Sequence, residues 1–97
     1  MMGSAIGTPA FMPPEQARGR LDDIGPRSDV YAAGAMLYHL LAARMPYAGA
    51  GESPTPREVL PRLIESPPDP LQAIGRGVPD ELVAIWERAM AREPAAR

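Results

Sequence analysis

The longest apolar stretch of the chain covers residues 30–43, where one glycine and His39 are the interruptions. Ser28 and Asp29 come just before it, and both residue types favour the N-cap position of a helix. The pattern therefore predicts a helix over residues 28–44. Because this helix has no polar side, we expect neighbouring elements to bury it all round.

Two further segments carry apolar residues at helical spacing. Residues 57–66 predict one amphipathic helix, although Pro61 lies inside the pattern and is expected to end or kink it unless it belongs to the first turn. Residues 80–92 predict another, with Asp80 as its cap. We expect the apolar stripe of this last helix to consist of Leu82, Ile85, Trp86, Ala89 and Met90. We expect its outward face to carry Glu81, Glu87, Arg88 and Arg92.

The remaining segments are predicted to be loops. Residues 1–27 are rich in proline, which fixes the backbone angle φ and removes hydrogen-bond donors, so we expect an ordered loop with a short helical turn at residues 14–18. Residues 46–57 and 67–78 are rich in proline and glycine. No segment alternates apolar and polar residues as a strand does. The sequence predicts a mainly α fold without a sheet, in one domain over residues 1–97.

Composition excludes several classes of site. The chain has no cysteine and a single histidine, His39, so neither a disulfide framework nor a metal site is expected. Its formal net charge is −2 with both signs intermixed, and no basic face for nucleic acid stands out. The longest apolar stretch is shorter than the roughly 20 residues that cross a membrane. The start of the chain lacks a leader pattern, and we expect a cytoplasmic protein without membrane contact.

Three stretches resemble, in order, the C-terminal lobe of bacterial Ser/Thr protein kinases. GTPAFMPPEQ at residues 7–16 is similar to the end of the activation segment of that family, with PPE where the family has Ala-Pro-Glu. RSDVYAAGAMLYHLLAARMPY at residues 27–47 resembles the central buried helix of the lobe. PDELVAIWERAMAREPAAR at residues 79–97 resembles its penultimate helix and the turn that follows. The resemblance covers nearly the whole chain and implies a partial protein kinase domain.

The resemblance also implies roles for individual residues. Gly7, Thr8 and Pro9 match the wall that receives a protein substrate beside the phosphoacceptor, so the rigidity of this segment would preorganise peptide binding. Glu15 and Arg97 match a glutamate and an arginine that pair in the family. Such a pair would tie the two ends of the chain together.

Four residues have a plainer interpretation beside the functional one. Asp29 matches an aspartate that braces the catalytic loop in the family, whereas in an isolated chain it is simply a residue of the first helical turn. Ser4 lies where family members often carry phosphoacceptors, but a serine in a terminal segment is more often just solvated. His39 is expected to be a satisfied core histidine, and Trp86 is expected to pack in the core.

The nucleotide-binding parts of the family have no counterpart in the sequence. A protein kinase uses a glycine-rich loop and a lysine on the phosphates, a catalytic aspartate, and an aspartate and an asparagine on magnesium. This chain contains no lysine, no asparagine and no Gly-x-Gly-x-x-Gly, His-Arg-Asp or Asp-Phe-Gly motif. ATP and magnesium therefore belong to the parent family, and no catalytic or metal-binding residue is assigned in this chain.

The sequence supports three hypotheses of function. In the first, the chain is a fragment of a Ser/Thr kinase domain, from a gene truncated or split inside the activation segment; it is inactive alone, and its partner is the remaining kinase segment or a protein substrate. In the second, it is a non-catalytic docking module that holds a kinase or a substrate peptide against residues 7–15 and the helix at residues 57–65. An unrelated helical adaptor is the third. We expect the isolated chain to fold marginally, because its central helix would lack neighbours.

Overall fold

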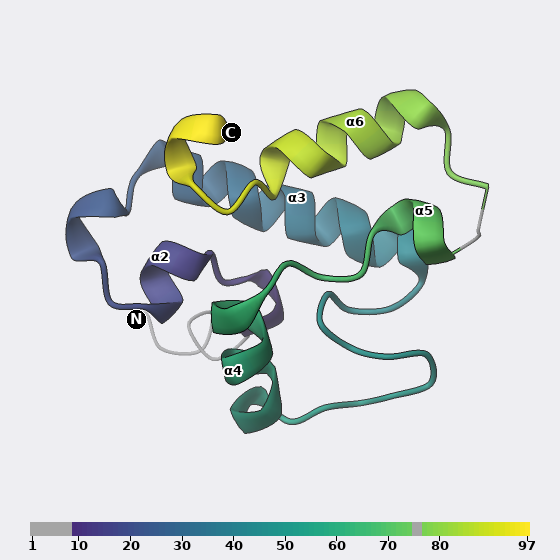
Figure 1. Ribbon diagram of the computed structural model, residues 1–97, viewed down its shortest axis with the longest axis horizontal. Helices are drawn as coiled ribbons and strands as arrows, with labels where there is room; N and C mark the ends of the chain where they lie inside the picture. Colours follow the sequence, from purple (N-terminus) through teal and green to yellow (C-terminus); the bar gives the residue numbers. More distant parts are fainter. Residues whose placement is uncertain (1–8, 75–76) are drawn as a thin grey trace.

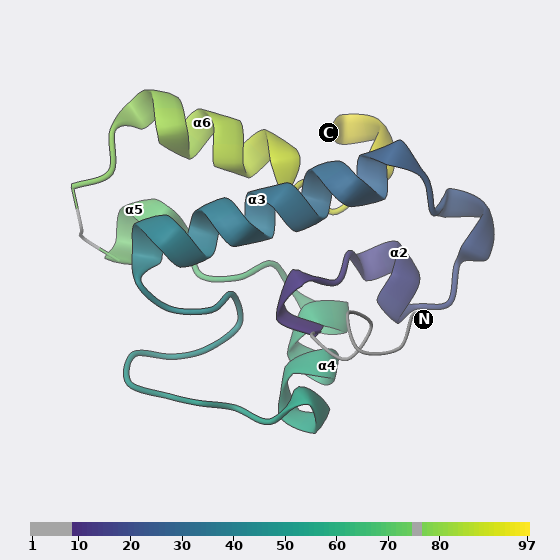
Figure 2. The same cartoon turned by 180° about the vertical axis from the view of Figure 1, so that it is seen from behind.

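A computed structural model describes residues 9–74 and 77–97, and this part of the chain is mainly helical with no strand (Figure 1). The central element is α3, Pro26–Ala42. Helix α6, Asp80–Ala89, lies along one side of α3 in both views (Figure 1 and Figure 2). A short helix, α5 (Leu71–Ile74), also packs against α3. The mainly α fold without a sheet that the sequence predicts is confirmed for the residues described.

The remaining elements form a second group beside α3. The 3-10 turn η1 (Pro9–Phe11) contacts both α3 and α4 (Pro56–Glu65), and α2 (Pro14–Ala17) also packs on α4. A second turn, η2 (Leu21–Asp23), leads from α2 toward α3. The last turn, η3 (Pro94–Ala96), contacts α3 and brings the end of the chain beside the start of that helix (Figure 1).

Helix α3 begins two residues earlier than its sequence suggests. Its N-cap is Gly25, and Pro26 occupies the first helical position, where the missing N–H costs no hydrogen bond. The backbone N–H of Gly25 donates to Ser28 Oγ over 3.1 Å. Ser28 is therefore a residue of the first helical turn whose hydroxyl accepts a hydrogen bond from the N-cap residue. The prediction that Ser28 or Asp29 is the N-cap is therefore wrong. At the other end, Ala43 stops the helix in the left-handed region with φ 58°.

Among the described residues, neighbours cover only one face of α3. On the opposite face Val30, Met36 and Leu40 are 43, 58 and 80% exposed. His39 is exposed as well, with its ring beside that of Phe11, so it is not the core histidine that was predicted. The apolar surface of α3 is wider than the elements packed on it, and the expectation of burial all round is not met here. The buried face consists of Ser28, Tyr31, Gly34, Ala35, Tyr38 and Ala42.

Helix α4 has a capping box at its start. The N–H of Glu58 donates to Thr55 Oγ1 over 3.3 Å, and the N–H of Thr55 donates to Glu58 Oε1 over 2.9 Å. Pro61 lies beyond the first turn, yet the helix continues through it to Glu65. Pro61 cannot donate to the carbonyl of Arg57, and both residues are exposed, so water can replace that donor.

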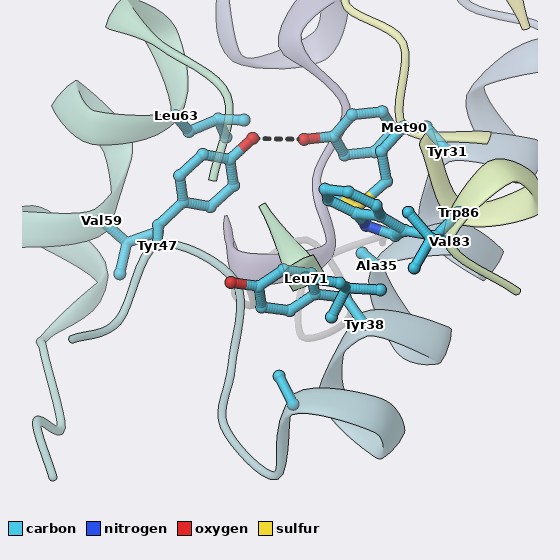
Figure 3. Packing of buried hydrophobic residues seen from close by; sticks show 11 residues of the cluster. Tyr31, Ala35, Tyr38, Tyr47, Val59, Leu63, Leu71, Val83, Trp86 and Met90 are labelled. Atoms are coloured by element: carbon cyan, nitrogen blue, oxygen red, sulfur yellow. Dashed lines mark hydrogen bonds between the residues drawn. The ribbon is translucent and has the colours of Figure 1, made fainter. Parts of the chain in front are cut away.

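Helix α6 turns most of the predicted stripe toward α3: Trp86 and Met90 are buried and Leu82 and Ala89 are half-buried, so only Ile85 was wrongly included and Val83 was missed. Val83, Trp86 and Met90 are buried, whereas Ile85 is 58% exposed. Trp86 belongs to the core: its indole N–H donates to Met90 Sδ, and its ring centroid lies 5.5 Å from that of Tyr38 (Figure 3). Val83 therefore takes the place in the core that was expected for Ile85.

The stretch at residues 67–78 contains a helix where only loop was predicted. Leu71 opens this helix, α5, and is 1% exposed against the core. Just before it, the hydroxyl of Tyr38 donates to the carbonyl of Asp69 over 2.9 Å. The segment is also held by an ion pair between Arg44 and Asp69 at 3.6 Å and by the partly buried Ile74, and none of these contacts produces a periodic pattern in the sequence.

Candidate substrate-binding site

A buried ion pair joins Glu15 and Arg97, which are 82 positions apart in the sequence. Arg97 Nη1 lies 2.7 Å from Glu15 Oε2, and Arg97 Nη2 lies 2.9 Å from Oε1. The hydroxyl of Ser28 donates to the same Oε2 over 2.8 Å. The two charged side chains are 0 and 2% exposed. We call these three residues the latch.

The guanidinium of Arg97 uses its other donors on the backbone. Its Nε donates to the carbonyl of Ala91 over 2.8 Å, and its two terminal nitrogens also reach the carbonyls of Arg27 and Arg92. Its carbon Cζ lies 4.9 Å from the ring centroid of Tyr31. Arg97 thus connects the end of the chain, the start of α3 and the first turn of α2.

The pKa of Glu15 reflects this environment. Burial by itself raises the pKa of the carboxyl, but hydrogen bonds from Arg97, from the backbone and from Ser28 outweigh burial and hold the pKa below its usual value. Glu15 is therefore ionised at neutral pH, and the latch is a charged pair.

The latch anchors the proline-rich segment. Glu15 follows Pro13 and Pro14, and all three residues are buried. Pro9 and Ala10 are buried too, where η1 meets α4. The segment from η1 to α2 is therefore held at both ends, by α4 and by the latch.

An apolar groove of about 250 Å³ lies beside this segment. Residues of η1, of the loop after α3 and of the start of α4 form it, and Glu52 is the one charged side chain among the described residues that line it. The apolar part of the lining comes from Pro9, Ala10, Met45, Ala48, Pro54, Pro56 and Val59.

The loop after α3 is held in a fixed shape behind the groove. Tyr47 has φ 69°, in the left-handed region that bulky residues rarely adopt. Arg62 donates to the carbonyl of Tyr47 over 2.7 Å and pairs with both oxygens of Glu52. The hydroxyl of Tyr47 bonds to that of Tyr31 (Figure 3), and it also accepts from Arg92 over 3.0 Å.

Sequence analysis missed the burial of Tyr47 and placed Arg92 on the wrong side. Tyr47 lies in a predicted loop, and a large aromatic residue among small and polar ones was the signal that it is buried. Arg92 was expected to face outward, which is wrong. Because α6 ends at Ala89, helical spacing no longer applies at Arg92, and its side chain turns inward to Tyr47 and the carbonyl of Leu63.

The structure brings some of the predicted site residues together. Ser4, Gly7 and Thr8 lie outside the described residues. Pro9 lines the groove. Asp29 is exposed in the first turn of α3, and its carboxylate has no hydrogen-bond partner in residues 9–74 and 77–97.

The described residues contain no group of three or more His, Cys, Asp or Glu side chains that could hold a metal ion. The sequence also lacks the lysine and asparagine that the family places on phosphates and metal. No helix of the described residues is long and apolar enough to cross a membrane.

Nearly the whole chain matches bacterial Ser/Thr protein kinases. It is 32% identical over 95 residues to serine/threonine-protein kinase PksC of Streptomyces coelicolor, which covers 98% of this chain and 16% of that kinase. It is 35% identical over 94 residues to PknB of Mycobacterium tuberculosis, which covers 97% of this chain and 14% of that kinase. The chain is a segment of a bacterial Ser/Thr protein kinase.

A third relative supports the same assignment. This kinase segment is 38% identical over 87 residues to the DNA damage-responsive kinase RqkA of Deinococcus radiodurans, covering 87% of the segment and 12% of RqkA. No protein-family model matches the segment. It spans less than a fifth of the length of the curated relatives that it matches.

Proposed function

We propose that this chain forms the protein-substrate side of a kinase that transfers the γ-phosphoryl group of ATP to Ser or Thr of a protein. The observation that carries the proposal is the buried pair of Glu15 and Arg97, which fixes the proline-rich segment against the start of α3. A surface held in this way lowers the ordering cost of binding an extended peptide. Pro9, a largely buried residue that lines the groove, lies at the start of this segment.

The chemistry of the transfer requires parts that this chain lacks. In our proposal, the remaining kinase segment supplies the sites for ATP and magnesium, and the 97-residue chain alone is inactive. The exposed outer face of α3, with Val30, Met36 and Leu40, is the surface on which that segment packs. Such an enzyme acts in the cytoplasm, where ATP is available.

The test is a two-part activity assay. The purified chain is mixed with a separately purified kinase segment that carries the glycine-rich loop, His-Arg-Asp and Asp-Phe-Gly, and transfer of labelled phosphate to a generic protein substrate is measured. We expect transfer from the mixture and none from the chain alone. Glu15→Gln should lower transfer by the mixture. Glu81→Gln, at an exposed position of α6, is the matched control and should leave it unchanged.

Two results would contradict the proposal. One is transfer by the chain alone after contaminating kinases have been removed. The other is a mixture in which Glu15→Gln transfers as fast as the parent. An upstream reading frame that encodes the missing motifs would give independent support for the two-part enzyme.

A docking module remains the second candidate, because the groove lies between the two segments that such a module would use. In that role the chain binds a peptide or a kinase without taking part in transfer. Peptide binding by the chain, together with no gain of transfer on mixing, would favour this second function.

A further inference from the structure

Two serines among the described residues are exposed and form no side-chain hydrogen bond there. They are Ser53, in the loop after α3, and Ser66, at the end of α4. The hydroxyl of Ser28 belongs to the latch, and that of Thr55 belongs to the capping box of α4. The two free hydroxyls differ in the charges that surround them.

The surroundings of Ser53 are acidic. Ser53 directly follows Glu52, and the charge of Glu52 is close enough to Glu58 to raise the pKa of that carboxyl. The guanidinium of Arg62 is already paired with both oxygens of Glu52. A phosphate on Ser53 would therefore meet carboxylates rather than a free cation.

The surroundings of Ser66 are basic. Arg18 Nη2 donates to the carbonyl of Ile64 over 2.8 Å, and Arg92 donates to the carbonyl of Leu63. Neither arginine forms an ion pair with another described residue. Arg18 is exposed, and its Nε and Nη1 have no partner in residues 9–74 and 77–97. Its guanidinium thus has donors to spare beside the last turn of α4.

A phosphate on Ser66 lies within reach of Arg18. Ser66 is two residues beyond Ile64, which is at most about 7 Å of chain, and the side chain of Arg18 is long and exposed. Glu65 and the negative end of the α4 dipole disfavour a negative charge here. A charge-assisted bond to a guanidinium is roughly twice as strong as a neutral one, and it outweighs these solvent-screened effects.

The hollow that Ser66 borders does not compete with Arg18 for the phosphate. Its volume is about 290 Å³, and Glu52 and Asp69 line it together with Arg62. Because Arg62 is already neutralised by Glu52, a phosphate in this hollow would be repelled by carboxylates. The side of Ser66 that faces Arg18 is therefore the favourable one.

The backbone presents Ser66 to an enzyme without unfolding of α4. The helix ends at Glu65, and Ser66 has φ −156° and ψ 162°, which is extended. Pro67 and Pro68 follow, and a residue before a proline is confined to extended geometry. The hydroxyl of Ser66 thus belongs to an exposed, extended stretch of chain.

We propose that Ser66 is phosphorylated by the kinase to which this chain belongs, and that Arg18 holds the phosphate. The Oγ of Ser66 forms a bond to the γ-phosphorus of ATP. The bond from that phosphorus to the oxygen bridging to the β-phosphate breaks, ADP leaves, and the hydroxyl proton passes to the catalytic aspartate of the kinase. Because Arg18 directly follows α2, the phosphoserine joins the proline-rich segment to the end of α4. This inference rests on the proposed kinase function and adds a regulatory site to it.

Mass spectrometry tests the modification. The mixture of the chain and the remaining kinase segment is incubated with magnesium ATP and digested with trypsin, which cuts after arginine. Residues 63–76 then form one peptide, in which Ser66 has the only hydroxyl side chain. We expect this peptide to gain one phosphate. Ser66→Ala should abolish the gain while transfer to a generic protein substrate continues, and Ser53→Ala is the matched control that should leave the gain unchanged.

Phosphorus NMR tests the contact with Arg18. Phosphoserine is incorporated at position 66 of the full 97-residue chain, and its second ionisation is followed in the same mixture. A guanidinium favours the dianion, so we expect the second acid dissociation constant to exceed that of a free phosphopeptide roughly two- to fivefold, as an exposed ion pair gives. Arg18→Gln should remove this increase. Arg57→Gln, at the opposite end of α4, is the matched control and should keep it.

The outcomes separate this inference from the proposed function. If residues 63–76 stay unmodified while the generic substrate is phosphorylated, the inference is overturned and the kinase function stands. If the ionisation of phosphoserine does not respond to Arg18→Gln, the link between α2 and α4 is refuted. If the mixture transfers phosphate to no protein at all, the proposed kinase function itself is contradicted.

Discussion

At the scale of single residues, Glu15 decides the shape of the proline-rich segment. Its carboxylate accepts from Arg97 on both oxygens and from Ser28 on one. Removing one partner of a buried pair leaves the other charge without compensation, which costs more than the pair itself contributes. A substitution at Glu15 that removes the charge is therefore expected to disturb this site even when it hardly changes the volume of the side chain.

Glu15→Gln keeps the shape of the side chain and removes its charge. We expect a loss of about 3–5 kcal/mol in the free energy of unfolding at neutral pH, because Arg97 stays buried without a counter-ion. A urea melt measures this loss. Glu81→Gln, which is exposed, should lie within about 0.5 kcal/mol of the parent. An equal effect of the two substitutions would show that the latch is not a stabilising pair.

The latch also predicts how stability depends on pH. The pKa of Glu15 is lower in the folded chain than in the unfolded one, so the unfolded chain takes up the proton first as the pH falls. The contribution of the Glu15–Arg97 pair to the free energy of unfolding is full above the ordinary pKa of a glutamate. It is lost as the pH falls through the pKa that Glu15 has in the folded chain. Urea melts over this acidic range should show a steeper loss for the parent than for Glu15→Gln. Parallel curves would contradict the assignment.

At the scale of elements, α3 and α6 pack closely because a glycine lies at their contact. A Cβ atom at Gly34 would lie 2.7 Å from Cβ of Ala89 and 3.0 Å from Cγ of Met90. Such an approach is closer than side chains tolerate, so the two helices would have to separate. The sequence shows Gly34 only as an interruption of an apolar run.

Gly34→Ala should destabilise the chain by about 1–3 kcal/mol through overpacking, although alanine favours helices. Thermal or urea melts followed by circular dichroism provide the measurement. Ala84→Gly, at an exposed position in the middle of α6, is the control, because it reports the difference in helix propensity between the two residues without any change in packing. A stabilising effect of Gly34→Ala would mean that α3 and α6 are not packed as described.

The capping box at the start of α4 leads to a second prediction at the scale of elements. Thr55→Ala removes the side-chain acceptor for the N–H of Glu58 and should cost about 1 kcal/mol of stability. Ser53→Ala changes a neighbouring exposed residue outside the capping box and should cost little. If the two substitutions behave alike in urea melts, the capping box contributes nothing.

Sequence reasoning succeeded where periodicity decides structure and failed where contacts distant in sequence decide it. Apolar spacing predicts the helices α3, α4 and α6 and most of the buried stripe of α6, but not which face of α3 is buried. Thr55 with Glu58 is a capping pattern readable in the chain. The inward turn of Arg92, the burial of Tyr47 and the helix at Leu71 depend on partners that no local pattern names. The groove is also of this kind, because its lining comes from three separate segments.

At the scale of the whole molecule, the elements cover α3 from one side only. Val30, Met36 and Leu40 remain exposed among the described residues, on a helix with few polar positions. Exposed apolar surface of this kind favours association with a partner or with other copies. The expectation that the isolated chain folds marginally stays a prediction. A substitution on the exposed face of α3 can test whether this face makes the chain associate.

Leu40→Glu should reduce self-association of the isolated chain, because its side chain is 80% exposed and contributes little to the described core. Light scattering at increasing concentration measures this, and the melting midpoint should change little. Gln72→Glu places the same charge at an exposed position of α5 and serves as the control. Equal effects of the two substitutions would indicate that net charge, rather than the face of α3, governs association.

The bond between Glu15 and Arg97 sets an order of events during synthesis. The proline-rich segment leaves the ribosome early, whereas the guanidinium that fixes it is made 82 residues later. Contacts so far apart in sequence tend to form late, because closing the long intervening loop costs entropy. We therefore expect a nascent chain that stops short of Arg97 to keep its first segment open to proteases, even when its helices have formed.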